Sequence, residues 1–191
     1  MSVQPKLKVC GVSDAAFAAA AEARGVYYLG FIFAEGSPRR VTPDAAAAIT
    51  ARLSGAARRV GVFVRETPDE IVRVMRHAGL DVVQLHRRAS EADVAALHAA
   101  GYEVWTLAGG APGDAVLFDS SHGDGETALR RGPWRTVLAG GVSAANVAAA
   151  LALGPDVIDV SGSLETAPGR KDVALLDEFL GVFCAKAKGI R

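Results

Sequence analysis

The stretch Lys8-Val9-Cys10-Gly11 closes the first apolar run of the chain and places a thiol where a strand gives way to a loop. Val9 and Cys10 end a predicted strand, Gly11 permits a sharp exit, and Ser13 is positioned to cap the alanine-rich helix that follows. If strands and helices keep alternating, the sheet is parallel and its catalytic groups gather at the carboxyl ends of the strands. Cys10 would lie there.

Composition predicts one globular domain over residues 1–191. The chain has 191 residues, of which 50% are hydrophobic and 22% charged. Its 21 basic and 21 acidic residues give a formal charge of zero, so nucleic acid and anionic membranes are not expected partners. No apolar run reaches the roughly 18 residues of a membrane span, and no secretory signal pattern opens the chain. We therefore expect a cytoplasmic protein with a small-molecule partner.

Two cysteines, Cys10 and Cys184, lie near opposite ends of the sequence. Their spacing matches neither a disulfide framework nor a zinc site, so no metal is predicted. Cys184 falls at an apolar position of the last predicted helix, which favours a place in the core.

Eight strands alternate with helices along the chain. Buried apolar runs predict strands at 6–10, 27–33, 59–64, 81–86, 102–107, 116–118, 135–139 and 157–160. Caps, prolines and closing glycines predict helices at 15–24, 42–53, 67–79, 90–100, 143–153 and 172–188, with a doubtful turn or two at 126–131. The run 109–113 is too short for a helix between strands five and six. This order predicts an α/β fold, a (βα)8 TIM barrel that lacks one helix and shortens the next.

Two glycine-containing loops follow predicted strands seven and eight. They are Gly140-Gly141 and Ser161-Gly162-Ser163. Backbone N–H groups of such loops commonly hold a phosphate at this place in the fold, so a phosphorylated substrate is indicated. The alternative is that these glycines only turn the chain.

Cys10 and Asp119 end predicted strands one and six. A thiol and a carboxyl group at separate strand ends could serve as base and acid in a proton transfer. Each would need its proton affinity tuned by its surroundings, and either residue alone would more often be structural.

Six sequence blocks together resemble phosphoribosylanthranilate isomerase of tryptophan biosynthesis. They occur in that family's order and span nearly the whole chain. The blocks are 8–11 (KVCG), 30–33 with 37–39 (GFIF, SPR), 60–64 (VGVFV), 83–86 (VQLH), 138–142 with 146–147 (LAGGV, NV), and 159–161 with 165 and 168–172 (DVS, E, PGRKD).

The resemblance implies a barrel of the ribulose-phosphate-binding type and a role for each site residue. Cys10 would be the general base, Asp119 the general acid, and Arg39 the group that holds the anthranilate carboxylate. Gly140, Gly141, Ser161, Gly162 and Ser163 would bind the phosphate, while His86 would either line the pocket or fix the end of its strand. The implied reaction is an Amadori rearrangement of N-(5-phosphoribosyl)anthranilate to 1-(2-carboxyphenylamino)-1-deoxyribulose 5-phosphate, without cofactor.

Departures from the family pattern keep a second hypothesis open. Arg40 replaces a usual aromatic residue, Arg87 a usual glycine, and the eighth loop reads Ser-Gly-Ser instead of Ser-Ser-Gly. The missing helix would expose an apolar barrel wall unless a rearranged loop or a partner covers it. The alternative is therefore a non-catalytic descendant that binds a phosphorylated ligand or a protein, as a monomer or a homodimer. An isomerase of histidine biosynthesis is disfavoured, because its paired aspartates would fall at Cys10 and Leu107.

Overall fold

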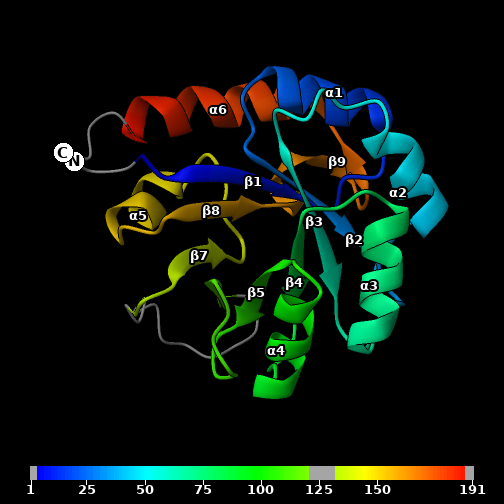
Figure 1. Ribbon diagram of the computed structural model, residues 1–191. Helices are drawn as coiled ribbons and strands as arrows, with labels where there is room; N and C mark the ends of the chain where they lie inside the picture. The colour runs from blue at the N-terminus through cyan, green and yellow to red at the C-terminus, as the bar shows by residue number, and fades with distance from the viewer. Residues whose placement is uncertain (1–3, 121–131, 188–191) are drawn as a thin grey trace.

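Eight parallel strands close into a barrel in sequence order in the computed structural model, which describes residues 4–120 and 132–187 (Figure 1). The strands are β1 (Lys6–Cys10), β2 (Tyr28–Ile32), β3 (Arg58–Phe63), β4 (Val82–Leu85), β5 (Glu103–Leu107), β6 (Ala115–Asp119), β7 (Arg135–Ala139) and β8 (Val157–Val160). The barrel closes where Lys6 to Val9 of β1 pair with Val157 to Val160 of β8. The predicted (βα)8 barrel is thus confirmed.

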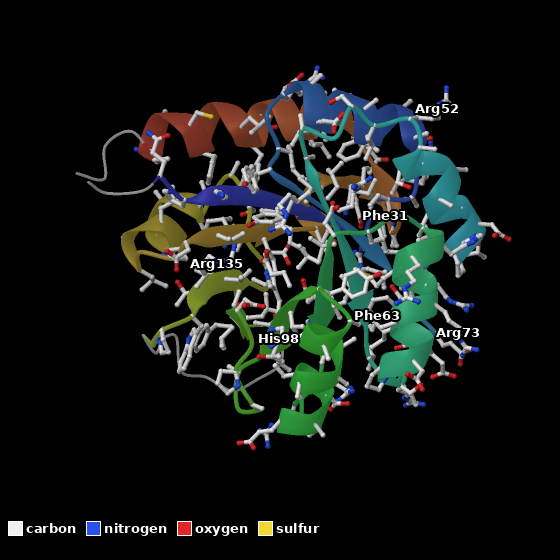
Figure 2. The ribbon with its side chains drawn as sticks, in the orientation of Figure 1. Phe31, Arg52, Phe63, Arg73, His98 and Arg135 are labelled. Atoms are coloured by element: carbon white, nitrogen blue, oxygen red, sulfur yellow. The ribbon has the colours of Figure 1, made fainter. Side chains whose placement is uncertain are left out.

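Helices cover the outside of this barrel. They are α1 (Ala15–Ala23), α2 (Pro43–Thr50), α3 (Pro68–His77), α4 (Glu91–Ala99), α5 (Val147–Ala152) and α6 (Val173–Ala187). Figure 1 shows α6 beside α1, with α2, α3 and α4 following around the barrel. Phe63 lies between α3 and the sheet, whereas Arg73 of α3 points away from the barrel (Figure 2).

Alternation along each strand produces two cores. Residues of one face fill the barrel interior, among them Tyr28, Val60, Trp105 and Leu117. Residues of the other face pack under the helices in a larger outer cluster. Because strands of this kind are buried on both faces, they are continuous apolar runs in the sequence.

The first helix begins at a cap that differs from the expected one. Asp14 accepts a hydrogen bond from the backbone N–H of Phe17 at 2.7 Å, so Asp14 is the N-cap. The prediction of Ser13 was wrong by one position. Its hydroxyl instead donates to the Gly169 carbonyl at 3.0 Å, joining the β1 loop to the loop after β8.

The connection between β5 and β6 contains no helix, as predicted. It is held against the outside of β5, where Asp114 N–H donates to the Val104 carbonyl at 2.7 Å and Gly113 N–H donates to Thr106 Oγ1 at 3.2 Å. Within the described residues, Leu153 is the single large hydrophobic side chain that is exposed, so Val104 and Val116 stay buried. The strand surface that a missing helix would expose, unless a rearranged loop or a partner covers it, is therefore buried at Val104 and Val116. The doubtful helical turn at 126–131 lies outside the described residues.

The segment after β8 holds elements that the sequence analysis did not predict. A 3-10 turn, η2 (Gly162–Leu164), leads into β9 (Glu165–Ala167), which pairs antiparallel with β10 (Arg170–Lys171). These short strands carry two charged residues, Glu165 and Lys171, back toward the end of the barrel.

Cys184 is exposed, so the prediction that it belongs to the core was wrong. The buried face of α6 is formed by Leu176, Phe179, Phe183 and Ala187. Cys184 follows Phe183 directly and therefore points about 100° away from that face.

The amino-terminal end of the barrel is closed by an ionic cluster. Glu103 accepts hydrogen bonds from Arg58 and Arg135, and Arg135 also donates to the Tyr28 hydroxyl at 3.1 Å. Arg135 lies at the start of β7 (Figure 2). Groups at this end of a (βα)8 barrel serve stability, because the chemistry takes place at the opposite end.

Candidate active site

A cavity of about 620 Å³ opens at the carboxyl ends of the strands. Every site residue predicted from the sequence lines it: Cys10, Arg39, His86, Asp119, Gly140, Gly141, Ser161, Gly162 and Ser163. These residues come from the ends of β1, β4, β6, β7 and β8 and from the loop after β2. Barrel closure therefore brings into one cavity groups that lie up to 153 positions apart in the numbering of the sequence.

Cys10 sits at the base of this cavity and is only 9% exposed. Burial raises the pKa of its thiol above the ordinary value, while the positive charge of Lys8 and a hydrogen bond from it oppose that rise. Its register partner on β2 is Gly30. A Cβ at Gly30 would lie 3.1 Å from Cys10 Sγ and 3.2 Å from Lys8 Nζ, so only glycine leaves room for both side chains.

A buried ion pair lies next to the thiol. Lys8 Nζ donates to Asp159 Oδ2 at 2.7 Å, and the Lys8 side chain is 0% exposed. The two residues are direct neighbours in the β1–β8 register. Burial by itself lowers the pKa of Lys8, but the negative charge of Asp159 and the hydrogen bond to it, with a smaller contribution from the nearby thiol, outweigh it and leave that pKa raised. Lys8 is therefore a cation at neutral pH.

Asp119 and His86 approach each other across the cavity. The distance from His86 Nε2 to Asp119 Oδ2 is 3.6 Å, and the Asp119 side chain is 9% exposed. Gln84 Nε2 lies 3.5 Å from His86 Nδ1 on the other side of the ring. His86 thus lines the pocket and also lies next to Asp119, the predicted acid.

Arg39 is fixed by a carboxylate from the hairpin after β8. Its Nε and Nη2 donate to the two oxygens of Glu165 at 2.8 Å each, and Lys171 Nζ donates to the same carboxylate at 2.6 Å. Burial opposes ionisation of Glu165, but the hydrogen bonds from Arg39 and Lys171 outweigh it and lower its pKa to about 2. Glu165 uses Nε and one N–H of Nη2, which leaves Nη1 and the second N–H of Nη2 for a ligand carboxylate.

The loops after β7 and β8 are tied together by a side chain. Ser163 Oγ donates to the Val142 carbonyl at 2.7 Å, and Ser161 Oγ donates to the Cys10 carbonyl at 3.0 Å. Gly140 adopts a φ of +89°, and a Cβ there would lie 2.5 Å from Asp119 Oδ1. No non-glycine residue in the described ranges has a positive φ, so Ser163 replaces the family's glycine without backbone strain.

Sequence reasoning assigned no site role to Lys8, Gln84, Glu165 or Lys171. Lys8 carried the clearest signal, because a lysine two positions before Cys10 shares its face of the strand in an otherwise apolar run. Asp159 both lines the cavity and holds Lys8.

Across residues 4–120 and 132–187, no group of three or more His, Cys, Asp or Glu side chains is arranged to hold a metal ion. A search of the same ranges finds no helix long and apolar enough to cross a membrane.

The fold and site together define a (βα)8 barrel whose pocket places a buried thiol and a carboxyl group at the ends of different strands. The family model described as N-(5'-phosphoribosyl)anthranilate (PRA) isomerase matches residues 7–182. The chain therefore belongs to the N-(5'-phosphoribosyl)anthranilate isomerase family.

Individual relatives agree with this assignment. The N-(5'-phosphoribosyl)anthranilate isomerase of Solibacter usitatus is 37% identical, over 91% of this chain and 94% of its own length. The crystal structure of phosphoribosyl anthranilate isomerase from Thermus thermophilus is similar with a TM-score of 0.82 and 34% identity, covering 94% of this chain and 98% of its own. A further isomerase, solved in complex with reduced 1-(o-carboxyphenylamino)-1-deoxyribulose 5-phosphate, has a TM-score of 0.79 and 28% identity over 97% of this chain and all of its own.

Proposed function

We propose that this chain is the isomerase that converts N-(5-phosphoribosyl)anthranilate into 1-(2-carboxyphenylamino)-1-deoxyribulose 5-phosphate in tryptophan biosynthesis. The observation that carries the proposal is the meeting of Cys10, Asp119 and Arg39 in one cavity of a barrel that belongs to this family. The complex of the relative with the reduced product analogue supports a phosphorylated substrate.

Asp119 is assigned as the general acid and Cys10 as the general base. Asp119 protonates the furanose ring oxygen, the C1′–O4′ bond breaks, and the anilino nitrogen forms a protonated Schiff base with C1′. The Cys10 thiolate then removes the proton on C2′, and the electron pair of that bond neutralises the Schiff base to give an enolamine. Tautomerisation yields the ketone, and a proton returned from Cys10 to Asp119 through solvent resets the site.

Arg39 is assigned to the anthranilate carboxylate. Its Nη1–Nη2 edge matches the spacing of two carboxylate oxygens, and the bonds from Nε and Nη2 to Glu165 hold the guanidinium plane in place. A pre-oriented arginine loses little side-chain freedom when the substrate binds.

The phosphate is assigned to the loops 140–141 and 161–163. Both line the cavity, and the bond from Ser163 to Val142 joins them into one wall. Backbone N–H groups of such loops are suitable donors for a dianion.

The decisive assay is the decay of anthranilate-type fluorescence after purified protein meets freshly prepared substrate. We expect decay with the wild type and a loss of about 10²-fold to 10⁴-fold in kcat for Cys10→Ala and Asp119→Ala. Arg39→Ala should mainly raise KM. A folded, monodisperse wild type without activity would overturn the proposal in favour of the non-catalytic ligand-binding or protein-binding descendant.

Three expectations from the sequence stay predictions. They are a single domain over 1–191, a cytoplasmic location, and a monomeric or homodimeric state. The solved isomerase from Thermotoga maritima, 29% identical to this chain, is described as dimeric and as the source of generated monomers.

A further inference from the structure

Lys8 is a buried cation to which the proposed mechanism assigns no role. Its side chain is fully buried, and Lys8 is not among the residues that line the cavity. Lys8 therefore cannot meet the substrate directly, and any effect on the reaction passes through a neighbouring side chain.

That neighbour is Cys10. Lys8 and Cys10 alternate with Val9 on β1, so both side chains point to the barrel interior. Lys8 Nζ and Cys10 Sγ both lie next to Gly30. A Cβ built on Gly30 would be 3.2 Å from Lys8 Nζ and 3.1 Å from Cys10 Sγ. The positive charge of the Lys8 ammonium favours the ionised form of the Cys10 thiol and so lowers its pKa, against the rise caused by burial.

We propose that Lys8 is the positioning residue that makes Cys10 a usable base, because its ammonium stabilises the thiolate from behind while Asp159 holds that ammonium in place. This inference rests on the proposed function only in calling Cys10 the base. The electrostatic claim concerns the thiol itself and holds without substrate.

The burial of Cys10 makes such a cation necessary. A thiolate in an apolar site loses the hydration that stabilises its charge, so burial alone would keep Cys10 protonated. An ammonium close to the thiol compensates for part of this loss, and it does so inside a low-dielectric barrel where solvent screens it little.

Other charges near the thiol are weaker or opposed. Asp159 disfavours the thiolate, while Lys171 favours it with a smaller effect than Lys8. Arg39 also interacts with Cys10, but its charge is matched by Glu165, which it shares with Lys171. Lys8 is therefore the main source of stabilisation of the Cys10 thiolate.

The test measures the rate of alkylation of Cys10 by iodoacetamide against pH, which reports the thiolate fraction directly. All proteins carry Cys184→Ala, because Cys184 is exposed and would react as well. We expect Lys8→Met to raise the midpoint of the profile by about 1–3 pH units. The acidic limb of the kcat/KM profile should move in the same direction by a similar amount.

Lys6→Met is the matched control. Lys6 lies on the same strand and face, but its ammonium stands over the Tyr27 ring at 3.6 Å from the centroid. Its removal changes net charge by the same amount and should leave the alkylation midpoint in place. Lys8→Met/Asp159→Asn covers the possibility that Lys8→Met alone leaves Asp159 unpaired and prevents folding. The double variant should still show a raised midpoint, because it also lacks the cation.

An unchanged or lowered midpoint in a folded Lys8 variant would overturn the inference. A midpoint that moves equally in Lys6→Met would do the same, because the effect would then be one of net charge. Failure of the wild type to turn over substrate would instead overturn the proposed function, and the alkylation profiles would remain readable.

Discussion

Arg39 and Glu165 are 126 positions apart in the sequence and are joined by two hydrogen bonds of 2.8 Å each. The Glu165 side chain is 4% exposed and that of Arg39 27%, so the pair is largely shielded at the carboxylate and open at the guanidinium. The short hairpin of β9 and β10 thus fixes the arginine, and Arg39 lines the cavity.

Substrate affinity should depend on this pair. Glu165→Gln removes the charge that orients Arg39, and we expect KM to rise about 10-fold with little change in kcat, since one bond to a charged group is weakened. Steady-state kinetics measures both values. Asp177→Asn is the control, because it neutralises the partner of Arg24 on the surface, where both side chains are partly exposed. A lower kcat with an unchanged KM in Glu165→Gln would contradict the positioning role.

Acid should destabilise the fold through Glu165. Its pKa is about 2 in the folded chain and about 4.3 when unfolded, so the folded state favours the ionised form. The stabilisation is complete above the unfolded pKa and is lost as the pH falls from about 4.3 to about 2. Because Arg39 is partly solvated, we expect a contribution of roughly 2 kcal/mol to the free energy of unfolding. Urea unfolding at pH 7 and pH 2.5 should show a smaller acid loss in Glu165→Gln than in wild type.

Asp119, the proposed general acid, should be sensitive to a methyl group at Gly140. Gly140→Ala would place a Cβ 2.5 Å from Asp119 Oδ1 and 2.6 Å from the Ser120 backbone nitrogen, at a φ of +89°. Displacing the acid should lower kcat about 100-fold. Gly25→Ala is the control, because Gly25 has a φ of +80° with nothing within 4 Å of its added Cβ. Gly25→Ala should lower the stability of the fold and leave kcat unchanged. Similar kcat values in Gly25→Ala and Gly140→Ala would refute the steric argument.

The helix-free connection should tolerate no side chain at Gly113. A Cβ there would lie 2.2 Å from the Val104 carbonyl oxygen, which belongs to the backbone of β5 and cannot step aside. We expect Gly113→Ala to lower the free energy of unfolding by about 2 kcal/mol or more, as overpacking does. Gly181→Ala, on α6 with no atom near its added Cβ, should instead stabilise by about 0.5–1 kcal/mol. Thermal unfolding followed by circular dichroism measures both, and equal stability of Gly113→Ala and wild type would mean that the loop does not pack as described.

Strand positions followed closely from the sequence because each strand of the barrel is buried on both faces. The predicted strands 6–10, 135–139 and 157–160 agree with β1, β7 and β8 at both ends, and the other five differ by one residue at one or both ends. Helix detail was less predictable. Ser13 and Asp14 are both good caps, and only the observed start of α1 at Ala15 decides between them.

The sequence alone determined the strand order, the missing helix and a set of site residues that all reach the cavity, because burial patterns and strand ends are local properties. Only the tertiary structure decided which charged side chains form ion pairs. Closure of β1 against β8 sets Lys8 beside Asp159, and the hairpin after β8 brings Glu165 to Arg39. Neither pair has a local sequence signal, because each depends on strands or loops more than 120 positions apart that become neighbours only when the barrel closes.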